Sequence, residues 1–334
     1  MSARAQPANH GILELDVSIT ATSSSIHAPT RSHSLLSDYA VLFKPRVSLM
    51  VIITAAAGFY LGSLASGISP FQIGLIKALF GIAMVTAGSS ALNQALERGT
   101  DRLMPRTAAR PMAQHRIGLV HGLAVGFILV CGGSIYLAWA TNPITGMLTL
   151  LTAVGYVAIY TPLKRITTLN TFIGAFPGAL PPLIGWTAAR GIIEWPAVAL
   201  FAILFVWQFP HFMAIGWMYR DDYARAGIRV TATQLPLREA ARSSTIQALF
   251  YVFLMIPVSL WPTWLHLTGF PYAIAALILD VYYLTATIRF MRIARNPDDP
   301  ENRVIARHLL KVSIIYLPLL LAAMMLDAKG RLLF

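Results

Sequence analysis

Repeated apolar runs of about 20 residues are the feature that most limits how this 334-residue chain can fold. A run of that length is what an α-helix needs to cross a hydrocarbon core roughly 30 Å thick. Nine such runs are expected, at about 45–64, 74–96, 117–139, 143–162, 169–189, 195–217, 245–264, 269–289 and 309–327. The pattern predicts an all-α, polytopic membrane protein whose helices form a bundle.

Composition agrees with this prediction. Only 12% of the residues are charged and the mean hydropathy is +0.63, whereas a soluble globular chain carries about 25% charged residues. These values exclude a disordered chain and a coiled coil, and the single cysteine, Cys131, excludes a disulfide scaffold.

The first 37 residues contain no apolar run and are rich in Ser, Thr, Ala and Pro. We expect a flexible cytoplasmic tail over residues 1–37, followed by one intramembrane domain over residues 38–334. An amphipathic transit peptide is the alternative, and Glu14 and Asp16 count against it because such peptides are poor in acidic residues.

The net charge of +12 would suggest a nucleic-acid partner in a soluble chain. Here nearly all of the 26 lysines and arginines fall in connections on one side of the expected spans; the exceptions are Lys77, Arg190, Lys329 and Arg331. Cytoplasmic loops retain positive charge, so the N-terminus is predicted to be cytoplasmic. The membrane would be a bacterial inner membrane, or the mitochondrial inner membrane if the source is eukaryotic, and no nucleic acid is needed to explain the charge.

The end of the second run carries Asn93, Glu97 and Asp101 at steps of four. Such steps rotate by only about 40° on an α-helix, so the three side chains form one stripe. Carboxylates near membrane depth are costly unless partnered, and such oxygen ligands suit Mg²⁺ held together with substrate phosphates. Three arginines suited to bidentate phosphate contact follow at the same spacing, namely Arg102, Arg106 and Arg110. A capped helix end with paired acids is the alternative.

A second polar segment, at the end of the sixth run, contains Trp207, Gln208, His211, Asp221 and Asp222. His211 and Asp222 are about three helical turns apart and share a face if the helix persists. The two acidic segments suggest half-sites that face one another across a bundle. A solvated helix end is the alternative for the aspartates. For His211, a hydrogen-bonded core histidine competes with a substrate role as ligand or proton acceptor.

Tyr160 and Lys164 lie one turn apart at the end of the fourth run, where they would point together at an anionic group unless Lys164 merely snorkels. In the fifth run, small residues at Gly174 and Gly178 allow close helix approach. The pair Pro181-Pro182 is expected to break that helix where it lines a cavity.

An isolated carboxylate, Asp280, lies near the middle of the eighth run, and Ser313 and Tyr316 lie in the ninth. An intramembrane carboxylate is a functional candidate by default. A hydrogen-bonded acid is sufficient to explain Asp280, and no role is assigned to it.

Together these motifs resemble the protohaem IX farnesyltransferase, or haem O synthase, family of UbiA-type intramembrane prenyltransferases. The matching segments are Asn93-x3-Glu97-x3-Asp101, Arg106-Thr-x2-Arg110-Pro111, Tyr160-x3-Lys164, Trp207-Gln-x-Pro-His211-Phe and Asp221-Asp222-Tyr223-x-Arg-Ala-Gly227-Ile228. The resemblance covers about residues 38–328. The chain departs from the pattern in having fewer acids in the first motif, where it carries Gln94 and Glu97, and in Ala109 and Arg229, where Asn and Pro are expected.

The resemblance implies nine helices around a central cavity that opens to the cytoplasmic side. It implies farnesyl diphosphate and haem b as substrates, Mg²⁺ as cofactor and haem O as product, and it leaves room for a haem-handling or oxidase-assembly membrane partner. The implied metal ligands are Glu97, Asp101, Asp221 and Asp222, with Asn93 beside them in the catalytic group. The implied diphosphate contacts are Arg102, Arg106, Arg110, Tyr160 and Lys164. The implied haem contacts are Trp207, Gln208 and His211.

Two other functions compete with this one. A related prenyltransferase would use the same diphosphate machinery on an aromatic or another tetrapyrrole acceptor. A transporter or channel would use Asp280, His211 and Glu97 as an ion pathway through broken helices, but it would not explain why acids and arginines concentrate at one face.

Overall fold

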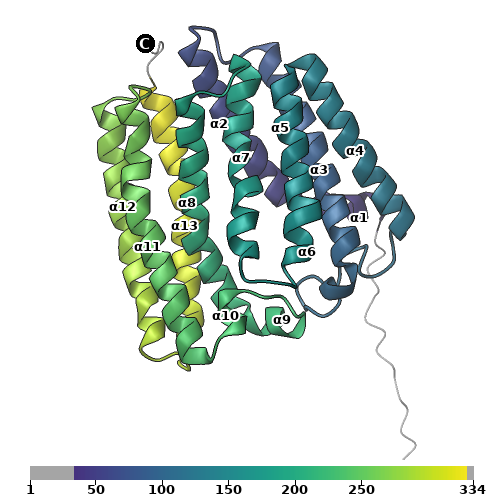
Figure 1. Ribbon diagram of the computed structural model, residues 1–334, viewed down its shortest axis with the longest axis vertical. Helices are drawn as coiled ribbons and strands as arrows, with labels where there is room; N and C mark the ends of the chain where they lie inside the picture. The colour runs from purple at the N-terminus through teal and green to yellow at the C-terminus, as the bar shows by residue number, and fades with distance from the viewer. Residues whose placement is uncertain (1–33, 329–334) are drawn as a thin grey trace, which may run out of the picture. The chain divides into compact units, whose positions relative to one another are not determined.

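The computed structural model describes residues 34–328, and this part of the chain is built from helices (Figure 1). In chain order they are α1 (Leu35–Leu42), α2 (Pro45–Ala65), α3 (Ile73–Asp101), α4 (Leu119–Ala140), α5 (Pro143–Val154), the π-helix η1 (Gly155–Tyr160), α6 (Thr161–Leu163), α7 (Asn170–Arg190), α8 (Trp195–Met218), α9 (Arg220–Arg225), α10 (Thr231–Gln234), α11 (Leu237–Trp264), α12 (Phe270–Phe290), the 3₁₀-helix η2 (Met291–Ala294) and α13 (Asn302–Asp327). The predicted tail lies outside the described residues except at its end, where residues 35–37 already belong to α1.

Within residues 34–328, nine helical spans are long and apolar enough to cross a membrane, which confirms the predicted multi-span membrane fold. The fourth span joins α5, η1 and α6. Four spans are longer than predicted. The helix α3 continues to Asp101, α11 begins at Leu237, α13 begins at Asn302, and the eighth span, α12 with η2, continues to Ala294. Hydropathy detects the part of a helix that lies in hydrocarbon and misses the polar turns that continue into water.

Two groups of helices make up the bundle (Figure 1). In one group α2 packs against α7, α3 against α4, and α5 against α4 and α7. In the other, α8, α11, α12 and α13 pack against one another, and α7 contacts α8 between the groups. Successive spans run in opposite directions, so the loops after α3, α6 and α8 all reach the same end of the bundle.

The helices α2 and α7 approach each other more closely than any side chain would allow. A Cβ atom placed on Gly58 would lie 1.9 Å from the carbonyl oxygen of Pro182, and one on Gly185 would lie 1.9 Å from that of Ala55. Small residues in membrane helices permit such backbone contact. Between α7 and α8, Gly178 instead makes room for a side chain, since a Cβ there would lie 2.2 Å from Oε1 of Gln208.

The prediction that prolines break the fifth span is wrong. The helix α7 is continuous from Asn170 to Arg190 with Pro177, Pro181 and Pro182 inside it. Proline removes a backbone donor, but neighbouring helices can hold the backbone of a membrane helix in place. Here α2, α5 and α8 all pack on α7.

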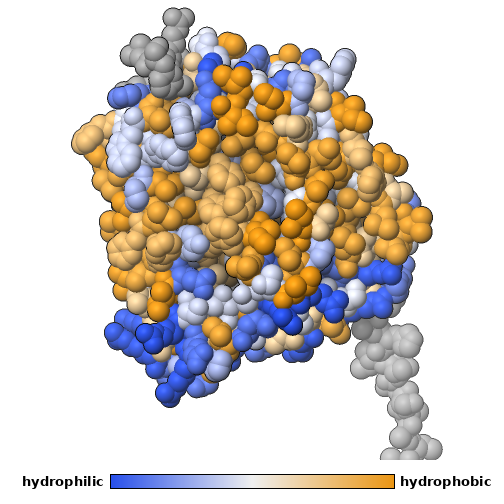
Figure 2. Space-filling view, in the orientation of Figure 1, coloured by the Kyte–Doolittle hydropathy of each residue, from blue (hydrophilic) through white to orange (hydrophobic). Residues whose placement is uncertain are grey.

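The surface divides into bands that fit a bilayer. Figure 2 shows an apolar belt across the helices, with hydrophilic residues gathered at the end that carries α9 and α10. Large apolar side chains on the spans are exposed, among them Phe127 and Ile135 of α4, Phe250 of α11 and Ile278 of α12. Lipid rather than water is the expected neighbour of such a surface.

Candidate active site

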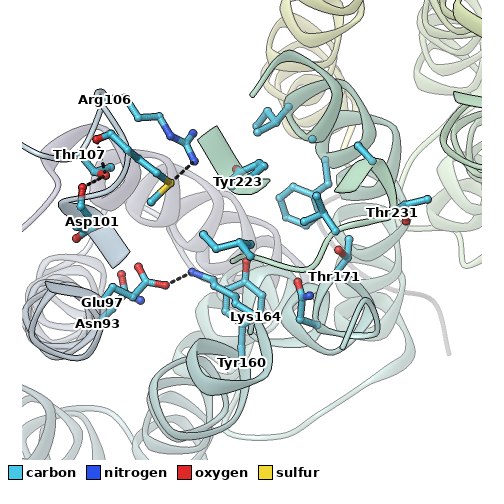
Figure 3. Close-up of a pocket in the computed structure, with 18 of the residues that line it drawn as sticks. Asn93, Glu97, Asp101, Arg106, Thr107, Tyr160, Lys164, Thr171, Tyr223 and Thr231 are labelled. Carbon is cyan, nitrogen blue, oxygen red and sulfur yellow. Dashed lines mark hydrogen bonds and ion pairs between the residues drawn. The ribbon is translucent and has the colours of Figure 1, made fainter. Parts of the chain in front are cut away.

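Two adjoining cavities lie where the spans meet the loops after α3 and α8. The first has a volume of about 310 Å³ and carries the charged residues. The second, of about 330 Å³, extends between α2, α3, α5, α7 and α8 and is mostly apolar. Tyr156, Tyr160, Lys164 and Phe212 line both, so the two cavities share a wall. Figure 3 shows Tyr160 and Lys164 at the polar cavity.

The predicted stripe on α3 forms one wall of the polar cavity, which Asn93, Glu97 and Asp101 all line. Asn93 is fully buried; its Oδ1 accepts from Nζ of Lys44 at 2.5 Å and its Nδ2 donates to Oγ1 of Thr161 at 3.0 Å. The amide is therefore held in one orientation.

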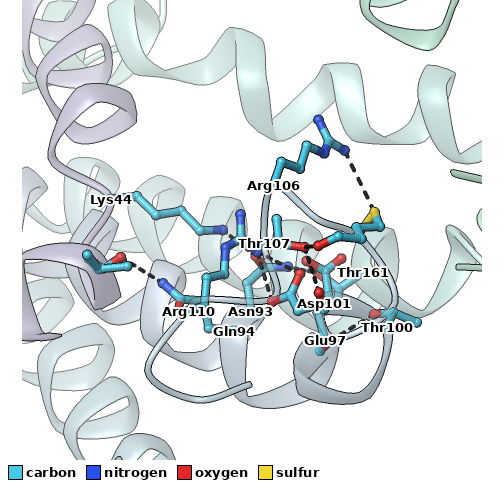
Figure 4. Close-up of polar contacts among 12 residues, drawn as sticks. Lys44, Asn93, Gln94, Glu97, Thr100, Asp101, Arg106, Thr107, Arg110 and Thr161 are labelled. Atoms are coloured by element: carbon cyan, nitrogen blue, oxygen red, sulfur yellow. Dashed lines mark hydrogen bonds and ion pairs between the residues drawn. The ribbon is translucent and has the colours of Figure 1, made fainter. Parts of the chain in front are cut away.

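Both carboxylates of this stripe are already paired with cations, Glu97 with Lys164 (Figure 3) and Asp101 with Arg110 (Figure 4). Nζ of Lys164 lies 2.6 Å from Oε1 of Glu97. Nη1 of Arg110 donates to both oxygens of Asp101, at 2.8 and 2.9 Å, and the Asp101 side chain is only 1% exposed. Burial of these acids is possible because each is paired.

Lys44 is a cavity residue that the sequence analysis used only to assign orientation. It lines the polar cavity and has a left-handed backbone conformation, with φ of 48°, which is uncommon outside glycine and concentrates at functional sites. Burial and the neighbouring Arg110 guanidinium lower the pKa of Lys44 to about 7. The sequence signal that could have identified Lys44 is its position directly before Pro45, at the start of a span.

Lys164, unlike Lys44, has a raised pKa and keeps its charge. Burial alone would lower the pKa of Lys164, but Tyr160 and the Glu97 carboxylate outweigh burial and raise it above its usual value. Its Nζ also lies 4.5 Å from the ring centroid of Tyr160. The predicted pair of Tyr160 and Lys164 is thus brought together at the cavity.

A π-helix presents the aromatic residues of the shared wall. The segment Gly155–Tyr160 has π-helical hydrogen bonding, a rare geometry that often occurs at functional sites. The rings of Tyr156 and Tyr160 stack at 5.8 Å. Tyr156 was not predicted, because the sequence gives no sign that α-helical spacing fails here.

Arg106 lies in the loop after α3 and joins it to the segment after α8. Its guanidinium lies 4.6 Å from the ring centroid of Tyr219 and 4.7 Å from that of Tyr223. Met104 packs beside it against Ala226 and Ile228. Arg106 and Tyr223 both line the polar cavity (Figure 3), so this contact closes one side of it.

Arg229, one of the departures from the family pattern, joins a second pair of loops. Its backbone N–H donates to the carbonyl of Lys164 at 2.7 Å, and its Nη1 donates to that of Ile166 at 2.8 Å. Nδ2 of Asn170 donates in turn to the Arg229 carbonyl at 2.5 Å. The loop after α8 is thereby fixed to the residue that pairs with Glu97.

The two aspartates of the second acidic segment do not line the cavities. The helix α8 ends at Met218 and α9 begins at Arg220, so the expectation that His211 and Asp222 share a helix face is wrong. The side chain of Asp221 is 83% exposed. Asp222 pairs with Arg225, and Tyr223 lines the polar cavity instead of either aspartate.

The Trp-Gln-x-Pro-His segment is divided between two faces of α8. Gln208 lines the apolar cavity, and its Nε2 donates to the carbonyl of Ala175 at 3.0 Å. Trp207 and His211 instead turn toward α13 and both contact Ser313. Neither lines the two cavities.

Arg102 also stays outside them. Its Nε donates to the carbonyl of Ala113 at 2.7 Å and its guanidinium contacts His115. The helix α3 ends at Asp101, so the three arginines do not continue its spacing. Arg106 and Arg110 reach the polar cavity and Arg102 does not.

Among the described residues, no three or more His, Cys, Asp or Glu side chains are gathered closely enough to hold a metal ion. The polar cavity offers the two carboxylates Glu97 and Asp101 and the amide of Asn93. Mg²⁺ is usually bound by one or two carboxylates together with substrate phosphates. The oxygen donors of the cavity therefore fit Mg²⁺ when a phosphate substrate supplies the remaining ligands.

Comparison with known proteins adds to this geometry. The UbiA prenyltransferase family matches residues 51–314. A protoheme IX farnesyltransferase of Koribacter versatilis is 45% identical, over 88% of this chain and 94% of its own length. A second, of Solibacter usitatus, is 37% identical over 88% and 99%. A third, of Opitutus terrae, is 38% identical over 89% and 96%.

Two solved structures share the fold. The structure of digeranylgeranylglyceryl phosphate synthase has a TM-score of 0.71 at 18% identity and covers 88% of this chain and 98% of its own. A UbiA homologue from Archaeoglobus fulgidus, bound to GPP and Mg²⁺, has a TM-score of 0.56 at 17% identity and covers 86% and 99%.

Proposed function

The chain belongs to the UbiA prenyltransferase family, and we propose that it transfers the farnesyl group of farnesyl diphosphate to a vinyl group of haem b, with addition of water, to give haem O. The acceptor follows from its relatives, which are named as protoheme IX farnesyltransferases. The observation that carries the proposal is the polar cavity, which combines paired carboxylates with an excess of cations beside an apolar cavity.

The polar cavity suits a diphosphate because its charge is positive before substrate arrives. Glu97 and Asp101 are each balanced by one cation, Lys164 and Arg110. Arg106 is additional, and Lys44 adds a further charge when it is protonated. Preorganised cations lower the barrier to C–O cleavage because they stabilise the charge that grows on the leaving group.

Magnesium would bind to Glu97 and Asp101 on the α3 wall, with Asn93 next to them. When bound, the ion would neutralise part of the diphosphate charge as the leaving group departs. The UbiA homologue from Archaeoglobus fulgidus is bound to Mg²⁺. Asp222 is the nearest candidate for a further carboxylate, since the adjacent Tyr223 already lines the cavity.

The apolar cavity suits the farnesyl chain. It begins at the wall shared with the charged site and is lined further in by residues such as Val51, Ile82, Val85 and Ile184. A substrate whose diphosphate lies among the cations would place its first carbons beside Tyr156 and Tyr160. An aromatic face attracts a cation, so these rings would stabilise the allylic cation and apolar walls would keep water away.

The reaction then balances as follows. The C–O bond of farnesyl diphosphate breaks and diphosphate leaves with the electron pair. The terminal carbon of a haem vinyl group attacks the allylic cation, and the positive charge moves to the carbon attached to the porphyrin. Water adds to that carbon and loses a proton, which leaves a hydroxyethylfarnesyl group.

The acceptor would approach from the face of α8 that carries Trp207 and His211. One turn further along this face, Ile215 lines the polar cavity, so the face leads to the reacting end of the prenyl chain. Lysines and arginines are concentrated in the loops on one side of the membrane. This distribution supports a cytoplasmic N-terminus and a cavity that opens to the cytoplasm. A bacterial inner membrane fits both, and an oxidase-assembly or haem-handling membrane protein is the partner proposed for the product.

The experiment is to incubate the purified protein with haem b, farnesyl diphosphate and Mg²⁺ and to separate the haems by chromatography. Haem O is expected, and its formation should stop when Mg²⁺ is chelated. If a phenolic acceptor is prenylated and no haem O forms, haem b is not the acceptor, but the protein is still a prenyltransferase. No consumption of farnesyl diphosphate with any acceptor would overturn the proposal.

A further inference from the structure

His211 and Ser313 form a contact between α8 and α13 that no step described above uses. Nδ1 of His211 lies 2.8 Å from Oγ of Ser313. The same Oγ lies 2.7 Å from the backbone carbonyl oxygen of Leu310, one turn earlier on α13. Ser313 is fully buried, so water cannot take part in either contact.

These two distances determine where the hydrogens lie. A hydroxyl group has a single proton, and a backbone carbonyl can only accept. Two oxygens 2.7 Å apart repel each other unless a proton lies between them, so the Ser313 hydroxyl donates to Leu310. The remaining lone pair of Oγ must then accept from His211, which places a proton on Nδ1.

Nε2 of His211 consequently carries a lone pair. Among residues 34–328, no side chain or backbone group is hydrogen-bonded to this atom. The ring is only partly buried and lies 5.0 Å from the Trp207 ring, at an angle of 31°. An aromatic neighbour and a hydrogen bond together fix the ring plane and leave one nitrogen available.

The support for Ser313 extends through the second helix group. Nε1 of Trp207 donates to the Ser313 carbonyl at 2.8 Å, and the hydroxyl of Tyr283 on α12 donates to the Trp207 carbonyl at 3.1 Å. One turn along α13, the hydroxyl of Tyr316 donates to Asp280 at 2.6 Å. Ser259 donates to the other Asp280 oxygen at 2.7 Å. Asp280, for which the sequence suggested no role, thus links α11 and α13 to α12 through hydrogen bonds, one turn along α13 from the contact between His211 and Ser313.

We propose that Ser313 is a positioning residue, which holds His211 in the Nδ1-protonated tautomer so that Nε2 binds the iron of the haem acceptor. The inference rests on the proposed function, because it requires haem b as the acceptor. Metal-binding histidines usually donate their other N–H to a fixed partner, which sets the tautomer and the ring orientation. Histidine is also a common axial ligand of haem iron.

The test compares two porphyrins that differ in the metal. The purified protein in detergent is titrated with ferric haem b and, separately, with metal-free protoporphyrin IX, and binding is followed by absorption. We expect Ser313→Ala to weaken the affinity for haem by about 10- to 100-fold, the usual effect of removing a group that orients a metal ligand. The affinity for metal-free protoporphyrin IX should change less than about twofold, because no iron–nitrogen bond is involved.

Three further variants define the reference points. His211→Ala should remove the absorption bands of histidine-ligated haem, and added imidazole should restore them. Ser313→Thr retains the hydroxyl and should retain most of the haem affinity. Ser134→Ala, which changes another buried serine, on α4, should change neither affinity.

An equal loss of affinity for both porphyrins in Ser313→Ala would mean that Ser313 only packs the helices, and would overturn the inference. Unchanged haem binding and an unchanged spectrum would overturn it as well. These results differ from failure of the proposed function itself. A wild-type protein that makes haem O without histidine-ligated bands contradicts only the inference, whereas one that binds neither porphyrin and forms no haem O contradicts both.

Discussion

The two acidic segments of this chain look alike in sequence and differ in structure. At the end of α3, Asp101 is almost fully buried and held by two hydrogen bonds from Arg110. On α9, Asp221 is 83% exposed, and Asp222 is paired with a neighbour on its own short helix. A long membrane helix places its last turn firmly, whereas the six-residue helix α9 holds Tyr223 against Arg106 but leaves both of its aspartates out of the cavities.

The contrast suggests that one half-site is built in advance and the other is completed by the substrate. Preorganised charges cost no rearrangement when the reaction occurs. Asp222 would contribute only after diphosphate and metal bring it into the polar cavity. Changes in the two segments should therefore differ in size and in kind.

The largest effect is expected from Asp101→Asn. The substitution keeps the shape of the side chain but removes its charge, so both the metal-binding oxygen and the partner of Arg110 are altered. Haem O formation should fall by about 100- to 1,000-fold, as for loss of a preorganised charge-stabilising group. Chromatography of the haems measures this. The matched control is Asp298→Asn, which neutralises an exposed acid and should leave activity unchanged; activity within threefold of wild type in Asp101→Asn would remove that residue from the site.

The next largest effect is expected from Asp222, and it should differ from the effect of changing Asp221. If substrate draws Asp222 inward, Asp222→Asn should lower activity by about 10- to 100-fold and raise the Mg²⁺ concentration needed for half-maximal rate, because a metal-binding oxygen is lost. Asp221→Asn should change the rate less than about twofold, as is usual for an exposed side chain. Equal effects of the two substitutions would show that α9 acts as a solvated terminus or is placed differently during turnover.

The bundle itself was predictable because hydropathy is a physical requirement of each span. All nine spans found between residues 34 and 328 followed from it, although α11 begins at Leu237, eight residues before the predicted limit. The continuity of α7 through Pro181 and Pro182 was not predictable, because it depends on helices that pack from elsewhere in the chain.

The site was predictable where one helix carries it. Asn93, Glu97 and Asp101 lie together because helical spacing alone brings them together. Lys44 reaches the cavity from another helix, and Tyr156 is turned inward by a π-helix. Such placements depend on tertiary contacts and backbone geometry that spacing in one segment does not encode.

Titration of Lys44, which lies beside the first acidic segment, tests whether burial there changes the pKa of a charged group. Its pKa is lowered to about 7, so above pH 7 the free protein must take up a proton before Lys44 can attract an anion. The affinity for inorganic pyrophosphate should weaken by up to about tenfold per pH unit above that value, relative to Lys44→Arg. Calorimetry between about pH 6.5 and 9 measures both proteins, and the ionisation of pyrophosphate cancels in their ratio. Parallel profiles would mean that Lys44 stays charged and that its burial has no such consequence.

The smallest effect concerns Arg225, which pairs with Asp222 across one turn while its own side chain is 56% exposed. Exposed pairs of this kind contribute less than about 1 kcal/mol, so Arg225→Gln should barely change thermal stability in detergent. If the pair holds Asp222 away from the cavity, the same substitution should lower the Mg²⁺ requirement by up to about fivefold, the equivalent of that energy. The double variant Arg225→Gln/Asp222→Asn should lose this gain, because the released carboxylate is absent. A gain that persists in the double variant would show that Arg225 acts through the charge of the surface and not by holding Asp222. The second half-site would then be no more mobile than the first.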